Sequence, residues 1–236
     1  CAKWRGKREG GGENDDLDGR HGHDTMAGGA GDDIYHVNSL GDLVREFAGQ
    51  GSDKVISIID YVMAGNIENL DLGSGASKGT GNALNNVMRC NDDGNELYGG
   101  GGKDHLKGGK GRDKLQGGDD DDWVDAGEGD DEIVGGDGAG NDTYVGGVGI
   151  DTIRYTSAIT GITVDLALGT ASGHEIDNDI LSQIENIIGG QAGDILRGDG
   201  QANVIDAYTG NDIIDGRGGA DSMIGGDGSD TYYVRD

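Results

Sequence analysis

The sequence predicts an all-β fold, a parallel β-roll or β-helix solenoid built from stacked nine-residue units. Three observations predict it. Gly supplies 51 of the 236 residues, Pro is absent, and the pattern GGxGxDxUx, in which U is a large apolar residue, returns every nine residues. Self-similarity at a fixed short period is typical of solenoids, in which each unit buries its apolar side chain against its neighbours.

The units keep their phase through three arrays. They begin at Gly10, Gly19, Gly28, Gly81, Cys90, Gly99, Gly108, Gly117, Ala126, Asp137, Gly146, Gly189, Gly198, Ala207, Gly216 and Gly225. The sixth position is Asp or Asn: Asp15, Asp24, Asp33, Asn86, Asn95, Asp104, Asp113, Asp122, Asp131, Asp142, Asp151, Asp194, Asn203, Asp212, Asp221 and Asp230. The eighth is apolar or Tyr: Leu17, Met26, Tyr35, Met88, Leu97, Leu106, Leu115, Val124, Ile133, Tyr144, Ile153, Leu196, Ile205, Ile214, Met223 and Tyr232.

Each unit has the chemistry of a turn followed by a strand. Glycines at positions one, two and four permit a positive φ and close approach of carbonyl groups. The next three residues form a short strand whose middle side chain points to one face. Two units therefore make one coil of roughly 18 residues, and stacked coils pair as parallel strands.

Two β-rich connectors separate the arrays. Val55–Ile59 is β-rich in the first and Ile162–Leu166 alternates in the second, and both connectors end in Ile-Glu-Asn. We interpret them as longer rungs that cap or continue the roll, the alternative being disordered linkers. The predicted organisation is 1–36 first array, 37–80 connector, 81–154 main array, 155–188 connector and 189–236 last array.

The charge predicts a cation partner. The net charge is −27 and only 33% of the residues are hydrophobic, so burial alone is a thin basis for a core. Stacked turns place carboxylates and carbonyls in columns that repel without a cation, and hard oxygen ligands suit Ca²⁺ better than Zn²⁺, copper or Mg²⁺. Roughly ten Ca²⁺ would offset on the order of 20 charges. The acidity argues against nucleic acid, and no apolar run is long enough to span a membrane.

With these motifs the chain resembles the RTX family of secreted calcium-binding repeats. The resemblance implies a parallel β-roll with an ion between turns 18 residues apart. One turn gives the carbonyls of positions two and four and the carboxylate of position six, and the later turn gives the carbonyls of positions one and three and its own carboxylate. It also implies export of the parent protein through a type I secretion apparatus and a place outside the cell or at its surface.

Carried onto this chain, the pattern groups the candidate metal ligands turn by turn. The pairs are Gly11, Glu13 and Asp15 with Gly28, Ala30 and Asp33; Gly100, Gly102 and Asp104 with Gly117, Asp119 and Asp122; Gly109, Gly111 and Asp113 with Ala126, Glu128 and Asp131; Gly127, Gly129 and Asp131 with Gly146, Val148 and Asp151; and Tyr208, Gly210 and Asp212 with Gly225, Asp227 and Asp230. The fourth of these pairs requires that the insertion at Gly135 and Gly136 bulge outward. Asp24, Asp142, Asp194 and Asp221 are further candidates.

Some turns depart from the pattern. Asn86, Asn95 and Asn203 remove a charge from position six. Position four is not Gly at Glu13, Leu84, Asp93, Asp120, Ala192 and Gln201. We expect these turns to bind calcium weakly or not at all.

Other chemistry finds little support. The sequence has no His-Glu-x-x-His or Gly-x-Ser-x-Gly motif, so we expect no catalytic site in this chain, although a domain upstream could carry one. Cys1 and Cys90 are too few for a disulfide scaffold. The basic stretch from Lys103 to Lys114 forms either a solvated surface or a site for an anionic polysaccharide. Trp123 either packs on a neighbouring rung or offers a glycan platform.

Three functions remain open. The first is a calcium-binding module of a larger secreted protein that folds on calcium binding outside the cell. The second is a building block of a surface layer, sheath or filament, because neither Cys1 nor Asp236 resembles a cap and self-association would cover the ends. The third is a glycan-binding module, or one attached to a secreted enzyme or toxin. The absence of an initiator Met predicts a fragment or a processed product.

Overall fold

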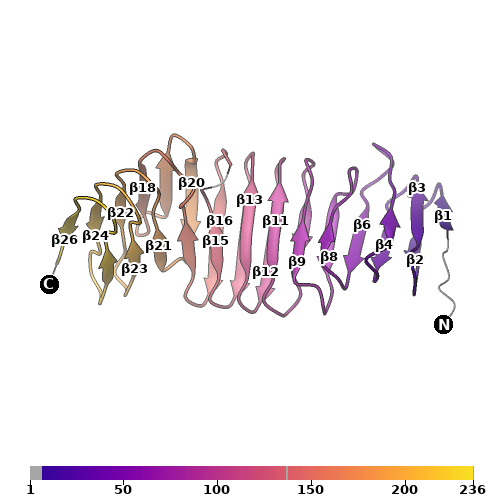
Figure 1. Ribbon diagram of the computed structural model, residues 1–236, viewed down its shortest axis with the longest axis horizontal. Coiled ribbons are helices and arrows are strands. Elements are labelled where there is room, and N and C mark those ends of the chain that lie inside the picture. The colour runs from indigo at the N-terminus through magenta and orange to yellow at the C-terminus, as the bar shows by residue number, and fades with distance from the viewer. Residues whose placement is uncertain (1–6, 137, 236) are drawn as a thin grey trace.

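The computed structural model describes residues 7–136 and 138–235. Cys1, Asp137 and Asp236 lie outside the described residues. Within them the fold is all β and is one elongated parallel solenoid, as predicted. Figure 1 shows the strands running across the long axis of the roll, with the two ends of the chain at opposite ends. No helix among the described residues has the length and apolar character that crossing a membrane requires.

Consecutive strands alternate between two faces of the roll. The 14-stranded sheet contains, in order, β2 (Asp16–Asp18), β4 (Ile34–Val37), β6 (Lys54–Ser57), β8 (Asn69–Leu72), β10 (Val87–Arg89), β12 (His105–Lys110), β14 (Trp123–Glu128), β16 (Thr143–Val148), β20 (Asp177–Ser182), β19 (Thr170–Gly173), β18 (Ile162–Asp165), β22 (Ile195–Arg197), β24 (Ile213–Asp215) and β26 (Thr231–Tyr233).

The opposite face is divided into two sheets. A nine-stranded sheet contains β7 (Tyr61–Val62), β9 (Lys78–Thr80), β11 (Glu96–Gly100), β13 (Lys114–Gly118), β15 (Glu132–Val134), β17 (Thr152–Arg154), β21 (Asn186–Ile188), β23 (Val204–Asp206) and β25 (Ser222–Ile224). A three-stranded sheet contains β1 (Lys7–Gly11), β3 (Thr25–Gly29) and β5 (Leu43–Val44). Strands from both connectors therefore lie in the same sheets as strands of the arrays.

Strand register follows the nine-residue period. Leu97 pairs with Leu115, 18 residues later, in the parallel ladder of β11 and β13. After the insertion the spacing is 20 residues, so that Ile133 pairs with Ile153. One part is not parallel: β19 pairs antiparallel with both β18 and β20. This segment lacks the period, and the chain reverses after β18 through Gly169, whose φ is +68°.

The core is a double row of position-eight side chains. Those of every described unit are buried except Met223 and Tyr232, which belong to the last two coils. Because one such side chain comes from each strand and neighbouring side chains face outward, the core is only as wide as two facing rows. Each coil is therefore stabilised chiefly by the coils before and after it.

The insertion at Gly135 and Gly136 does not bulge outward, which corrects our expectation. Both glycines are buried beside Tyr155. A Cβ on Gly136 would lie 2.9 Å from the Tyr155 Cα and 2.7 Å from the Ser157 Oγ. The extra residues fit because two glycines let the backbone pass directly against the next coil.

Replacement of a position-eight side chain tests this core. Leu106 is fully buried, so Leu106→Ala should lower the free energy of unfolding by about 2–5 kcal/mol through the cavity that it leaves. Ile150→Ala removes an apolar side chain that is 59% exposed and should change stability by less than about 0.5 kcal/mol. Urea unfolding in excess calcium measures both, and equal effects would contradict the assigned register.

Candidate metal centre

The position-six carboxylates link successive coils by the same hydrogen bond. The backbone N–H of one position-six residue donates to the Oδ1 of the Asp in the next coil. The distance is 2.8 Å from Asp113 N to Asp131 Oδ1, and 2.9 Å from Asp131 N to Asp151 Oδ1 across the insertion. The same bond joins Asp15 to Asp33 at 2.7 Å. The period therefore brings the predicted carboxylates together in columns along the roll.

The second oxygen of many of these carboxylates has no protein partner. Among the described residues, the buried Oδ2 atoms without a hydrogen bond include those of Asp33, Asp104, Asp113, Asp122, Asp131, Asp151 and Asp212. A buried carboxylate oxygen without a partner is costly unless a proton or a cation neutralises it. The unpaired oxygens repeat from coil to coil, so this requirement repeats as well.

Glycine backbone closes the turns around these oxygens. A Cβ on Gly117 would lie 2.0 Å from the Asp122 Oδ2. Gly129 has a φ of +149°, and a Cβ there would lie 1.6 Å from the Gly111 carbonyl oxygen. The donors in each turn are thus backbone carbonyls and carboxylates. This all-oxygen set suits Ca²⁺, and the residues present fit that ion.

Burial gives these carboxyl groups a high affinity for protons. It raises the pKa of Asp104, Asp113 and Asp122 to about 7, although each accepts a backbone hydrogen bond that acts in the opposite direction. The pKa of Asp151 rises to about 6 for the same reason, and the neighbouring Asp131 and Glu185 add to the rise. Near neutral pH, a proton and a cation therefore compete for the same oxygens.

The predicted partner turns lie on adjacent coils. Gly109 pairs with Gly127, and Gly127 pairs with Gly147 beside Gly146. Asp119 N donates to the Gly100 carbonyl at 3.0 Å, and Ala30 N to that of Gly11 at 2.9 Å. In the last array, Gly210 N donates to the Asp227 carbonyl at 2.8 Å. These contacts bring together the turns of each predicted pair, while the ligand role of each residue stays a prediction.

Two predicted ligands differ from the rest because protein groups bond to both of their oxygens. Asp142 Oδ2 accepts the Tyr144 hydroxyl at 2.7 Å, and its Oδ1 accepts the Asp122 N–H. Asp194 accepts the N–H groups of Ile162 and Gly190. The physical signal for a cation is therefore weaker at these two carboxylates.

Several acidic residues of the connectors extend the columns, and the repeat pattern did not identify them. Asp53 Oδ1 accepts the Asp33 N–H at 2.9 Å, and Asp179 Oδ1 accepts that of Asp142 at 3.1 Å. Glu68 and Glu185, from the two Ile-Glu-Asn segments, take the same role toward Asp53 and Asp151. Asp53, Glu68 and Glu185 stand two residues before a buried apolar side chain, as position six does, and that spacing could have revealed them.

The asparagine turns satisfy themselves. Asn95 Nδ2 donates to the Ala76 carbonyl at 3.0 Å, while its Oδ1 accepts the Asn91 N–H. Asn203 Nδ2 likewise donates to the Glu185 carbonyl at 2.8 Å. An amide NH₂ group thus bonds to carbonyls of the preceding coil without bringing a charge. This gives a physical reason for the prediction that these turns bind calcium weakly.

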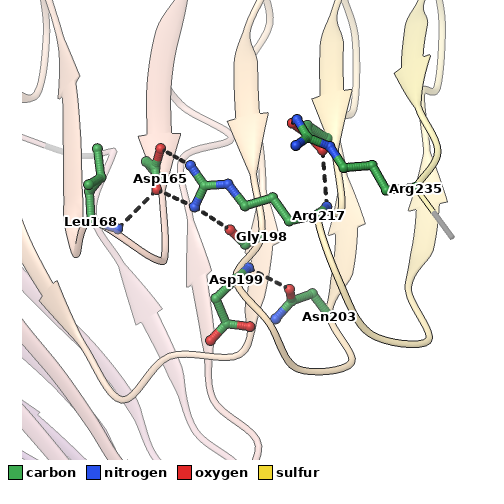
Figure 2. Close-up of polar contacts among 8 residues, drawn as sticks. Asp165, Leu168, Gly198, Asp199, Asn203, Arg217 and Arg235 are labelled. Atoms are coloured by element: carbon green, nitrogen blue, oxygen red, sulfur yellow. Dashed lines mark hydrogen bonds and ion pairs between the residues drawn. The ribbon is translucent and has the colours of Figure 1, made fainter.

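One turn uses a guanidinium group (Figure 2). Arg217 stands at position two with a φ of 64° and donates to the Gly198 carbonyl at 3.0 Å. Its two terminal nitrogens also bind both oxygens of Asp165, two coils away. The bidentate pair holds the pKa of Asp165 below its ordinary value although burial opposes this. Arg235, the next position-two arginine, similarly binds Asp215.

The basic stretch lies on both faces and is matched by acids one coil away. Lys107 belongs to β12 and Lys114 to β13, which are in different sheets. Lys107 Nζ lies 3.7 Å from an Asp125 oxygen, and Lys114 Nζ lies 3.2 Å from one of Glu132. Pairs of this kind along the sheet favour the solvated-surface reading.

Trp123 packs on a neighbouring rung, one of the two alternatives for it. Its ring meets His105 edge to face at a centroid distance of 4.0 Å. Lys107 Nζ lies 5.6 Å from the centre of the Trp123 ring.

Comparison with known proteins agrees with the repeat pattern. The family model for the RTX calcium-binding nonapeptide repeat matches residues 9–39, 80–115, 108–139, 117–153, 188–223 and 197–232, together more than half of the chain. The chain is also similar to an endo-1,3-1,4-beta-glycanase, ExsH, of Rhizobium meliloti strain 1021, with 35% identity over 65 residues. That match covers 28% of this chain and 14% of the relative.

The raised pKa values predict an unusual pH dependence for metal-stripped protein. The pKa of about 7 for Asp104, Asp113 and Asp122 exceeds the value of about 3.9 of an unfolded chain. The folded state therefore binds more protons between these values, and its stability falls as the pH rises from about 4 to 7. Circular dichroism of metal-stripped protein across this range should show loss of β-structure toward pH 7.5. With excess calcium that loss should disappear, and a metal-free stability that ignores pH would contradict the account.

The Arg217 pair should stabilise the last array. The Asp165 side chain is only 5% exposed, so Arg217→Met leaves its charge buried without the bidentate partner. We expect a loss of about 3–5 kcal/mol in the free energy of unfolding, measured in excess calcium. Arg89→Met removes a more exposed pair with Asp71 and should cost less than about 1 kcal/mol. Equal losses would show that the buried pair contributes no more than a surface one.

Proposed function

Because the chain belongs to the family of RTX calcium-binding nonapeptide repeats, we propose that it is a calcium-binding module of a secreted protein and that it folds on meeting calcium outside the cell. One observation carries the proposal. Buried carboxylate oxygens without a protein partner recur along the roll, for example at Asp104, Asp113 and Asp122. Their positions follow the period that the family model matches.

The carboxylates supply both the barrier to folding and the means of overcoming it. Without a neutralising partner, the columns that contain Asp113 and Asp131 gather negative charge in a buried place, which favours the open chain. Bound Ca²⁺ supplies positive charge and oxygen coordination between neighbouring turns. The Asp carboxylates and the turn carbonyls then hold adjacent coils together, so that binding free energy becomes folding free energy.

A calcium-dependent fold suits a protein that crosses a membrane unfolded. Extracellular calcium modules bind with dissociation constants of about 10⁻⁴ to 10⁻³ M. At lower calcium concentrations the chain stays open and can pass through a type I secretion apparatus. Outside the cell the same carboxylates bind calcium and the roll forms.

A second candidate is that the module is joined to a secreted enzyme. The observation in its favour is the partial match to a protein named as an endo-1,3-1,4-beta-glycanase, 14% of whose length is covered. In such a protein the roll would accompany a separate catalytic domain. The half-exposed Tyr232 and Tyr233 on the last strand, β26, favour instead the alternative of an extracellular assembly in which another strand covers this edge.

A calcium titration followed by circular dichroism tests the proposed function. β-Structure should appear with calcium and not with an equal concentration of Mg²⁺, which keeps its water and requires a tighter octahedron. Equal β-structure in chelator and in calcium would overturn the proposal.

A single carboxylate tests where the ions bind. Asp113→Asn keeps the shape of a buried position-six side chain and should lower the number of bound Ca²⁺ ions, measured by equilibrium dialysis. Asp92→Asn removes the same charge from an exposed side chain and should leave that number unchanged. An unchanged number in both variants would contradict the site assignment and leave the calcium titration standing.

A further inference from the structure

Three acidic side chains meet where the first array passes into the connector. Asp33 ends the last turn of the array, Glu46 follows β5, and Asp53 precedes β6. One carboxylate oxygen from each can be chosen so that all three atoms lie within 4.8 Å of one another. Asp33 and Asp53 are buried and Glu46 is 9% exposed.

One oxygen of this cluster lacks a partner. Asp33 is 0% exposed, and its Oδ2 accepts no hydrogen bond. Its Oδ1 accepts the Asp15 N–H at 2.7 Å, so the carboxylate is fixed in place with its free oxygen toward the cluster. Among the described residues, no Lys or Arg forms an ion pair with any of the three acids. Three negative groups therefore converge without a positive partner.

Protein donors hold Glu46 in this place. Its Oε1 accepts the Tyr35 hydroxyl and the Gly28 N–H, the latter at 3.2 Å, and its Oε2 accepts the Phe47 N–H at 3.3 Å. Donors to both oxygens favour the ionised carboxylate. Asp53 is fixed by the Asp33 N–H. The three groups are thus pre-arranged as acceptors, which is what a cation requires of its ligands.

The position of Glu46 explains how a third carboxylate enters. Val44 pairs with Met26, so Glu46 stands one coil above Gly28, the first glycine of a repeat. A Cβ on Gly28 would lie 1.8 Å from the Asp33 Oδ2. A side chain that leaves the backbone at such a position is directed toward the carboxylate column. The ordinary repeat has glycine there and offers only the two position-six carboxylates.

We propose that Asp33, Glu46 and Asp53 form a calcium site with three carboxylate ligands, and that this site fills first. The inference rests on the proposed function and deepens it. Glu46 lies outside every nonapeptide and outside the ranges that the family model matches. Because the affinity of a calcium site rises with the number of its charged ligands, the third carboxylate makes this site tighter than the repeat sites. The junction therefore orders before the arrays as calcium rises.

Counting bound ions in the full chain tests the site. Glu46→Gln and Asp53→Asn should each weaken the tightest calcium-binding step about tenfold in isothermal titration calorimetry. Glu132→Gln is the matched control, because it removes one charge from a glutamate that pairs with Lys114 and Arg154 on the surface. If Glu46→Gln and the control give the wild-type first step, the inference is overturned. If the wild-type chain binds no calcium at all, the proposed function itself fails.

A second readout does not depend on removing a carboxylate. Tb³⁺ takes calcium sites and emits when a nearby tyrosine is excited, and the Tyr35 hydroxyl contacts Glu46. The first equivalent of Tb³⁺ should give sensitised emission in the wild type and lose most of it in Tyr35→Phe, which keeps all three acids. Tyr98→Phe, a change at an exposed hydroxyl bonded to Glu96, should leave that emission unchanged. Undiminished emission from Tyr35→Phe would overturn the proposal.

Discussion

The roll depends on one hydrogen bond, from a backbone N–H in one coil to a buried carboxylate oxygen in the next. This bond sets the stacking distance and register of the turns, as between Asp104 and Asp122. It also forces the carboxylate to lie where water does not reach, with its other oxygen unpaired. The structure thus gains a coil-to-coil link and a buried negative charge together, and neutralisation of that charge becomes a condition of folding.

The chain meets this condition in four ways. At Asp113 and its equivalents, an unpaired oxygen faces a glycine turn and suits a cation. At Asn95 the amide bonds to the carbonyls directly. At Asp142 the Tyr144 hydroxyl bonds to the second oxygen, and at Asp165 a guanidinium binds both. Departures from the repeat are therefore local substitutes for an ion, and each occurs where the donors of that turn have changed.

The sequence was sufficient for the parts of the fold that follow a rigid period. The buried row from Leu17 to Ile214 and the column of position-six side chains follow from phase alone. The antiparallel strand β19 and the buried course of Gly135 and Gly136 do not, because they depend on how an aperiodic segment meets the coil beside it. Glu46 escaped for the same reason. Its place is set by pairing between β5 and β3, which no repeat encodes.

The connectors carry the charge pattern from array to array. Asp53 and Glu68 continue the column after Asp33, and Asp179 and Glu185 continue it after the main array, so carboxylate hydrogen bonds do not stop where the glycine pattern stops. In a solenoid, stability is approximately the sum of each unit and its contacts with its neighbours. A column that runs through the connectors joins the arrays by the same contacts that join coils within them. The asparagine turns, which carry no charge, are then the places where one coil depends least on the ions of the next.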